Sequence, residues 1–130
     1  MKNFLAEIKK CAQNKYSSSH LVGAEDCDEK GKMNMWALLN LIEQTHLYPA
    51  ECLSQIAPQY KKDLKQVSLQ LYHPAHEGDI LEFEARFYEI DKRKVELKVF
   101  VRKIKPDKST KRICRASYFF HATDNTETAV

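Results

Sequence analysis

The segment from Met33 to Gln44, MNMWALLNLIEQ, restricts the possible fold more than any other part of this sequence. It contains no Gly, no Pro and no run of β-branched residues, which favours an α-helix, and its only charged residue is Glu43. A surface helix has one polar face, whereas this segment is apolar on nearly every side. We therefore expect a buried helix that other elements wrap. It should end between His46 and Pro49, because a proline disfavours helical geometry in the residue before it.

Four later segments alternate apolar and polar residues, as strands with one buried face do. They cover residues 66–72, 80–90, 95–101 and 114–120, and short polar turns separate the last three. Strands joined by short turns form an antiparallel meander, and a further short strand is expected at His20–Asp26. The residues predicted to face inward are Val67, Leu69, Leu71, Leu81, Phe83, Ala85, Phe87, Val95, Leu97, Val99, Val101, Cys114, Ala116, Tyr118 and Phe120.

One strand, one buried helix and four long antiparallel strands, in that order, predict an α+β protein of the hotdog fold. In this fold a curved antiparallel sheet wraps one long central helix. The length of 130 residues suits one domain, so we assign residues 1–130 to a single hotdog domain. Within it, residues 1–16 are expected to form an N-terminal helical segment and residues 123–130 a flexible tail.

Composition and cysteine spacing exclude several classes of protein. With 43% hydrophobic and 30% charged residues, the chain has material for a core and for a polar surface, unlike a disordered chain. Its longest purely apolar run, Met35 to Leu39, is far shorter than the roughly 20 residues that span a bilayer. The N-terminus lacks the features of a secretory signal. We therefore expect a cytoplasmic protein without a membrane span, whose four cysteines are free thiols.

Positive charge is concentrated in the second half of the chain. Residues 86–115 contain 12 Lys and Arg against 4 Asp and Glu, although the net charge of the whole chain is only +3. A basic surface of this kind attracts anionic ligands, and the alternative is a set of solvated strand faces and turns. Nucleic acid is not the expected partner, because the aromatic residues of this half fall mostly on the inward alternation and single-strand binding needs exposed ones.

Several short motifs surround the predicted helix. In sequence order they are Asp26-Cys27-Asp28, Gly31, Asn34, Glu43, the stretch YHPAHEGD at 72–79 and the stretch RASYF at 115–119. Together they resemble the 4-hydroxybenzoyl-CoA thioesterase family of hotdog enzymes and the related acyl-ACP thioesterases. Those families carry D-x-x-G before the central helix, an acidic residue two to three helical turns later, and P-A-x-x-G-D at the start of a later strand. The resemblance covers roughly residues 20–122. The chain departs from the pattern at Lys32, where the acyl-carrier branch has His, and at Met35, where the family has an aromatic residue.

The resemblance implies hydrolysis of acyl-CoA or acyl-carrier-protein thioesters. It assigns Asp28 as the nucleophile or general base and the backbone N–H of Met35 as the donor to the oxyanion. Asn34 and Glu43 are then supporting groups, although in other hotdog branches the helix carboxylate is itself the base. These assignments make chemical sense, because thioester hydrolysis needs a nucleophile or base together with oxyanion donors, and a helix N-terminus offers unpaired N–H groups.

The same residues have simpler interpretations. Asp28 is also a typical turn residue, and Asn34 is also a typical helix cap. Glu43 lies either near an exposed helix end or in the apolar interior, where a carboxylate needs a partner.

Ligands and partners follow from the same resemblance. Coenzyme A or phosphopantetheine would enter as part of the substrate, with no separate cofactor, and the pantetheine phosphates would meet basic residues such as Arg86, Lys103 or Arg115. No metal site is expected, because His73 and His76 lie in a predicted loop without a second ligand cluster. The open edges of a lone hotdog sheet predict a homodimer or a dimer of dimers, and an acyl carrier protein is a further candidate partner.

Two alternatives to hydrolysis stay open. A non-catalytic hotdog protein would bind acyl-CoA without turnover, and fold alone does not separate it from an enzyme. A hotdog dehydratase would use His20 together with the helix carboxylate, although the spacing from His20 to Glu43 is longer than in that family.

Overall fold

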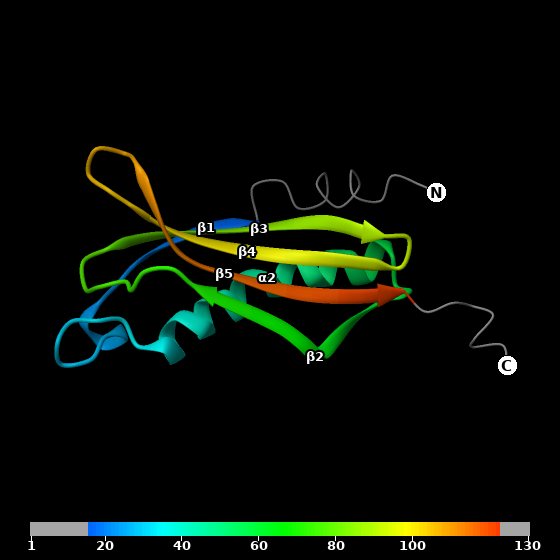
Figure 1. The fold of residues 1–130 in the computed structure, drawn as a ribbon, viewed down its shortest axis with the longest axis horizontal. Helices are drawn as coiled ribbons and strands as arrows, with labels where there is room; N and C mark the ends of the chain where they lie inside the picture. Colours follow the sequence, from blue (N-terminus) through cyan, green and yellow to red (C-terminus); the bar gives the residue numbers. More distant parts are fainter. Residues whose placement is uncertain (1–15, 123–130) are drawn as a thin grey trace, which may run out of the picture.

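The computed structural model describes residues 16–122. One long helix lies across one face of a five-stranded sheet (Figure 1). The expected N-terminal segment, except for Tyr16, and the expected tail at 123–130 lie outside the described residues. The elements are β1 (Ser17–Leu21), the 3-10 turn η1 (Ala24–Asp26), α2 (Met35–Ile56), β2 (Tyr60–Leu71), β3 (Ile80–Asp91), β4 (Lys94–Ile104) and β5 (Thr110–Ala122).

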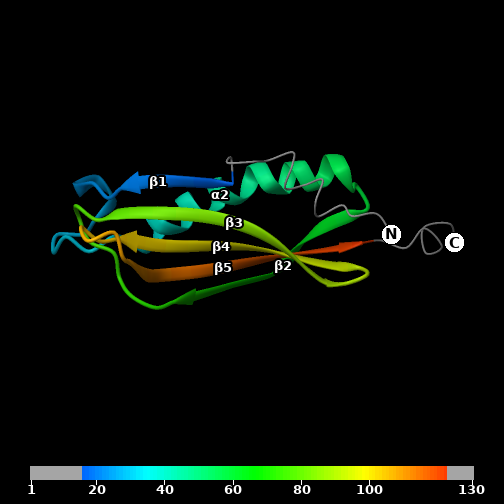
Figure 2. The ribbon, with the colours of Figure 1, turned by 90° about the horizontal axis from the view of Figure 1, so that it is seen from above.

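The sheet has the strand order β1-β3-β4-β5-β2, and every neighbouring pair is antiparallel (Figure 2). The meander of β3, β4 and β5 forms its centre, and β1 and β2 form its two edges. A long helix packed against such a sheet is the predicted hotdog fold, which the structure confirms.

The core lies between α2 and the helix-facing side of β3, β4 and β5. On these three strands, every residue predicted to face inward is buried. Alternation identified them correctly because each strand has one covered and one open face. The helix contributes Ala37, Leu38, Ile42 and Leu53 to the same cluster.

Helix α2 is longer than the sequence predicts, since it continues through Pro49 to Ile56. A proline inside a helix removes one hydrogen bond and costs about 3 kcal/mol or more. The turns beyond it bury Cys52 and Leu53, and full burial of one leucine side chain alone contributes about 1.5–3 kcal/mol. The expected helix end between His46 and Pro49 is therefore wrong, because tertiary packing outweighs the local preference.

The expectation that α2 is buried on every side is also wrong for the single chain. Its buried residues form one face, and Met35, Trp36 and Leu39 are exposed. The inward residues of β2 are exposed as well, although each lies opposite a buried residue of β5: Val67 opposite Tyr118, Leu69 opposite Ala116, and Leu71 opposite Cys114. Within residues 16–122, no helix combines the length and apolarity that a membrane crossing requires.

The first strand is shifted from its predicted position. It covers Ser17–Leu21 rather than His20–Asp26. The chain leaves the sheet after Leu21, and residues Ala24–Asp26 form the single turn η1 instead of continuing the strand.

Strand β2 begins at Tyr60 rather than Gln66 and bends sharply along its length (Figure 1). Its register with β5 shifts between Lys62 and Val67, and such irregularities bend a strand. The bend allows the first residues of β2 to approach the middle of α2, where Lys62 contacts His46.

The burial of α2 predicts that two of its leucines contribute very differently to stability. Leu53 is 0% exposed, whereas Leu47 is 57% exposed. We expect Leu53→Ala to lower the free energy of unfolding by about 2–5 kcal/mol, through lost burial and the cavity left behind. Leu47→Ala should change it by less than about 1 kcal/mol. Urea unfolding followed by circular dichroism measures both, and similar losses would contradict this packing.

Candidate active site

Two loops from distant parts of the sequence meet at the start of α2. The loop of residues 22–34 carries the D-x-x-G motif, and the loop of residues 72–79 carries the P-A-x-x-G-D motif. The structure therefore brings the two motifs side by side. Four backbone hydrogen bonds join them: Met33 N–H to the Ala75 carbonyl at 2.8 Å, Glu77 N–H to the Gly31 carbonyl at 2.8 Å, Gly78 N–H to the Val22 carbonyl at 2.9 Å, and Val22 N–H to the Asp79 carbonyl at 2.9 Å.

Asp28 lies in a tight turn just before the helix. Its Oδ1 accepts hydrogen bonds from the backbone N–H groups of Lys30 at 2.9 Å and Lys32 at 3.0 Å. Gly31 completes the turn with a φ of +81°, a region that favours glycine. The side chain is exposed, and Oδ2 has no hydrogen-bond partner within residues 16–122. Asp28 thus stabilises the turn through one oxygen and presents the other to solvent.

The neighbouring Asp26 has a separate structural contact that the sequence did not reveal. Its Oδ2 accepts hydrogen bonds from His20 Nε2 at 2.8 Å and from the backbone N–H of Gly23 at 3.1 Å. The hydrogen bond from His20 is the main reason that the pKa of Asp26 lies below its usual value. This pair ties the end of β1 to the loop before the helix.

The N-terminus of α2 has free hydrogen-bond donors. Asn34 occupies the N-cap position, but its side chain makes no capping hydrogen bond. The first turn contains no acidic residue, and the first N–H groups of any helix, here from Met35 onward, have no intrahelical acceptor. These donors and the positive end of the helix dipole suit an oxyanion or another anionic group.

An apolar groove borders these donors. It has a volume of about 220 Å³, and its walls come from the start of α2, the end of β2 and the loop after β2. The lining residues include Met33, Met35, Leu38, Leu71, Tyr72 and Ala75. The groove offers space for an apolar chain beside the helix N-terminus.

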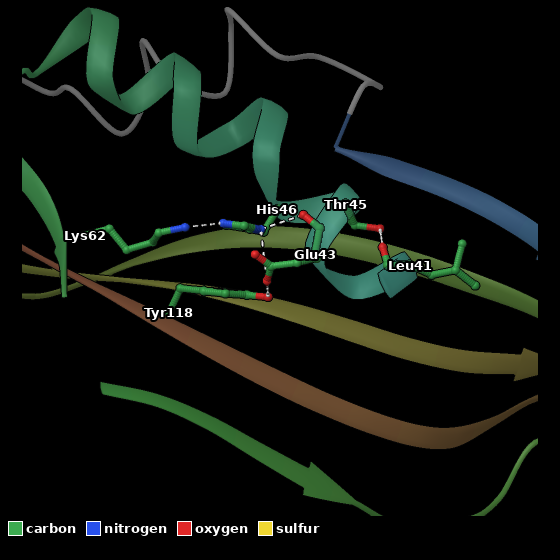
Figure 3. A network of polar contacts seen from close by, with 6 residues as sticks. All are labelled: Leu41, Glu43, Thr45, His46, Lys62 and Tyr118. Carbon is green, nitrogen blue, oxygen red and sulfur yellow. Dashed lines mark hydrogen bonds and ion pairs between the residues drawn. The ribbon is translucent and has the colours of Figure 1, made fainter. Parts of the chain in front are cut away.

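Glu43 lies in the middle of α2, and its side chain is 56% exposed. Its Oε1 accepts a hydrogen bond of 2.7 Å from the Tyr118 hydroxyl on β5 (Figure 3). Glu43 is therefore neither deeply buried nor near a helix end. Its carboxylate nevertheless has the hydrogen-bond partner that was expected for a buried position.

His46 and Lys62 extend this contact into a network that the sequence analysis missed (Figure 3). His46 is 0% exposed, and its ring stacks on Tyr118 with centroids 4.0 Å apart. Its Nε2 lies 2.7 Å from Lys62 Nζ, and its Nδ1 lies 2.6 Å from the carbonyl oxygen of Glu43. A charged lysine only donates hydrogen bonds. Nε2 is therefore the acceptor, Nδ1 carries the proton, and His46 is a neutral ring.

The surroundings of the two rings act on their pKa values. Burial lowers the pKa of His46, and the charge of Lys62 lowers it further, against an opposing contribution from its hydrogen bond to Glu43. Burial also raises the pKa of Tyr118, and its hydrogen bond to Glu43 adds to the effect. Both rings are therefore held in their neutral forms at neutral pH.

One sequence signal pointed to His46. It shares the buried face of α2 with Leu38, Ile42 and Leu53 at helical spacing, so its burial was predictable. No sequence pattern predicted that Lys62 would contact His46, because the contact depends on the bend in β2.

The two candidate carboxylates belong to different places in the chain. Glu43 follows Met35 by eight residues, which is about 12 Å along a helix that rises 1.5 Å per residue. Asp28 precedes the helix altogether. The D-x-x-G turn, Asn34 and Met35 therefore form one cluster, and Glu43 with His46, Lys62 and Tyr118 forms another.

The three basic residues predicted to meet phosphates do not form one cluster. Arg86 pairs with Glu84 at 3.0 Å, and Lys103 pairs with Asp79 at 3.3 Å. Arg115 donates a hydrogen bond of 2.9 Å to Gln70. They lie on β3, β4 and β5 respectively, and their contact with phosphates stays a prediction.

Cys27, Cys52 and Cys114 are free thiols. Burial raises the pKa of Cys114 to about 12 and also raises that of Cys27. Because thiolates are the reactive form, these two side chains are poor nucleophiles at neutral pH. Among residues 16–122, no group of three or more His, Cys, Asp or Glu side chains is arranged to hold a metal ion.

Comparison with solved structures shows what the chain is similar to. An acyl-CoA hydrolase from Staphylococcus aureus, solved with butyryl coenzyme A and coenzyme A, has a TM-score of 0.67 at 19% identity and covers 85% of this chain. This chain spans 66% of that hydrolase. The 4-hydroxybenzoyl-CoA thioesterase from Pseudomonas sp. strain CBS-3 has a TM-score of 0.61 at 13% identity, with 82% of each chain covered. A hexameric thioesterase from Yersinia pestis has a TM-score of 0.63 at 16% identity, covering 84% of this chain and 87% of its own.

Comparison at the level of sequence identifies no relative of this chain. No family model matches the chain, and no curated protein matches it. At identities below 20%, the structural likeness establishes the hotdog fold.

The buried network predicts a pH-dependent stability. The folded state holds His46 neutral, whereas in the unfolded chain a histidine takes up a proton near pH 6.5. The unfolded state then binds more protons, so stability falls as the pH drops through this range. Between pH 7.5 and 5.5 we expect His46 to account for a loss of about 1 kcal/mol. Urea unfolding of the wild type and of His46→Gln at both values measures this. Equal pH dependence in the two proteins would contradict it.

Proposed function

We propose that this protein hydrolyses acyl thioesters at the N-terminus of α2. The observation that carries the proposal is the uncapped helix N-terminus, which opens on an apolar groove beside the Asp28 turn. Free N–H donors suit the negative charge that develops on a thioester oxygen during attack, and the groove suits the apolar acyl chain. The structural likeness to acyl-CoA hydrolases and thioesterases supports the same chemistry.

Each residue of this cluster has a role in the proposed reaction. The thioester oxygen accepts a hydrogen bond from the Met35 N–H, which polarises the carbonyl carbon. Asp28 takes a proton from water through its unpartnered Oδ2 while the water oxygen bonds to that carbon. The carbon–sulfur bond then breaks, and the leaving sulfur takes the proton from Asp28, which returns to its carboxylate form. Direct attack by Asp28, followed by hydrolysis of the anhydride, gives the same products. Asn34 supports the site at the helix entry.

Two rival functions give different results in the same assay. A non-catalytic acyl-CoA-binding protein is favoured by the structural role of Asp28 Oδ1 in its turn, and it would bind substrate without releasing thiol. A dehydratase would need His20 to act with the helix carboxylate. The Nε2 of His20 instead contacts Asp26 at 2.8 Å.

Two isosteric variants test the assignment of the base. Asp28→Asn keeps an oxygen that can accept the two turn hydrogen bonds, but it removes the basic carboxylate. We expect kcat to fall about 100-fold or more with acyl-CoA binding retained, because a positioned base commonly contributes about 10²–10⁴-fold. Glu43→Gln should lower kcat less, since Glu43 lies about 12 Å along the helix from Met35. Thiol release from a panel of acyl-CoA substrates measures both.

Asp91 offers a matched control for these variants. Its Oδ1 accepts a backbone hydrogen bond from Arg93 at 2.8 Å in the β3–β4 turn, which resembles the arrangement at Asp28. Asp91→Asn should leave kcat unchanged, and thermal melts should show all three variants folded. A larger loss in Glu43→Gln than in Asp28→Asn would transfer the role of base to the helix carboxylate. Full activity in both would exclude the mechanism, and binding without thiol release from the wild type would favour the non-catalytic rival.

We further propose that the protein is a homodimer or a dimer of dimers through the β2 edge. A free strand edge with apolar side chains invites pairing with another strand. β2 has twelve residues and an exposed row formed by Val67, Leu69 and Leu71, whereas the opposite edge strand β1 has five residues. The exposed Met35 and Trp36 of α2 would be covered in the same assembly.

Matched charge substitutions at the two edges test this assembly. We expect light scattering to give a mass of at least twice 15.2 kDa at micromolar concentration. Leu69→Glu on β2 should shift the protein towards monomer, because a buried unpaired charge is costly. Leu21→Glu on β1 should not. A wild-type monomer, or a larger effect at Leu21, would overturn the proposal.

A further inference from the structure

A second hollow lies beyond the groove at the helix N-terminus. It has a volume of about 400 Å³, within the range of small-molecule sites. Strands β4 and β5 and the residue after β2 form it. Its walls include three arginines and two aromatic rings: Arg102, Arg112, Arg115, Tyr72 and Phe100.

Two of the three arginines of the hollow carry positive charge that no carboxylate among the described residues neutralises. Within residues 16–122, neither Arg112 nor Arg115 has a carboxylate partner. Arg102 pairs with Glu82 and Glu84 through one terminal nitrogen, but its Nε is buried and has no hydrogen-bond partner among the described residues. The guanidinium groups of Arg112 and Arg115 therefore suit an anionic ligand, above all a phosphate that accepts two hydrogen bonds from one arginine.

The arginines are held in place by their neighbours. The Arg112 guanidinium lies over the Tyr72 ring, 5.2 Å from its centroid. Gln70 accepts hydrogen bonds from Arg115 at 2.9 Å and from the Tyr72 hydroxyl at 3.3 Å. A positively charged site that is ordered before binding loses less entropy when a ligand arrives.

Tyr72 connects this hollow to the proposed active site. It lines both the arginine hollow and the apolar groove beside Met35. A ligand with a reacting group at the helix N-terminus can therefore pass Tyr72 and place its other end among the arginines. That ligand must be long and must be anionic at the end distant from its acyl group.

We propose that Arg112 and Arg115, with Tyr72 and Phe100, bind the phosphorylated adenosine end of coenzyme A. This inference rests on the proposed function and selects coenzyme A thioesters over carrier-protein thioesters as the substrate class. A concave site of this volume, with a ring at its wall and arginines for phosphates, suits a nucleotide. The acidic surface of a carrier protein would need only exposed charges and no hollow.

Adenosine 3′,5′-bisphosphate tests the hollow without any thioester chemistry. We expect calorimetric titration to show that it binds the wild type. Arg112→Gln and Arg115→Gln should each weaken binding roughly 10-fold, because hydrogen bonds to charged groups contribute about 1.5–3 kcal/mol. Lys98→Gln is the matched control, since Lys98 also lies over a tyrosine ring on the same sheet, 4.8 Å from the centroid of Tyr88. It should bind like the wild type.

Kinetics with two substrates separate this inference from the proposed function. In the two arginine variants, KM for acyl-CoA should rise about 10-fold with kcat unchanged, and added salt should raise the wild-type KM. KM for the corresponding S-acyl-pantetheine, which lacks phosphates, should not change. Absence of hydrolysis for every thioester would defeat the proposed function, while the bisphosphate titration would still decide the role of the hollow. No bisphosphate binding to the wild type, equal binding to all variants, or a KM effect restricted to acyl-carrier-protein substrates would overturn the inference.

Discussion

The structure depends on a mismatch of widths between one helix and a five-stranded sheet. Strands lie about 4.8 Å apart, so five of them extend across roughly 19 Å, whereas a helix with its side chains is about 10–12 Å wide. α2 therefore covers the central strands β3, β4 and β5 and leaves the second half of β2 open. The exposed apolar row on β2 and the groove beside Met35 both follow from this incomplete cover. The narrow helix thus leaves one edge strand uncovered and also leaves space for a ligand.

The start of the helix is positioned by backbone pairing rather than by side chains. Hydrogen bonds from Met33 and Glu77 join the loops at 22–34 and 72–79, and these bonds do not depend on residue type. The chain therefore keeps the arrangement although Lys32 and Met35 depart from the pattern of the families it resembles. Backbone donors at the helix N-terminus are equally independent of side chains, which is why a methionine at position 35 is compatible with the proposed oxyanion contact.

Sequence patterns predicted the parts of this fold in which one short-range rule acts alone. Alternation identified the buried faces of β3, β4 and β5, because each residue's environment is set by its own strand. The rules failed where distant packing competes with local preference. Pro49 lies inside α2, because the residues beyond it gain a core contact that no local rule contains. The contact between His46 and Lys62 could not be predicted from the sequence for the same reason, since it requires the bend in β2.

For the proposed reaction, the position of the backbone donors is the reason to assign the base to Asp28 rather than to Glu43 within one chain. A tetrahedral intermediate needs donors within about 3 Å of its oxygen, and in an α-helix only the first turn has N–H groups without an acceptor. Those around Glu43 are used within the helix, and the backbone of Glu43 lies about 12 Å from that of Met35 along the axis. A carbonyl placed at Glu43 would therefore lack backbone donors, whereas a carbonyl placed at Met35 would meet them. The loop that carries Asp28 leads into this end of the helix, where the Asn34 N–H donates a hydrogen bond of 2.8 Å to the Asp26 carbonyl. In the proposed reaction, the oxyanion rather than the carboxylate determines where attack occurs, and the hydrogen bond from Tyr118 is consistent with the supporting role proposed for Glu43.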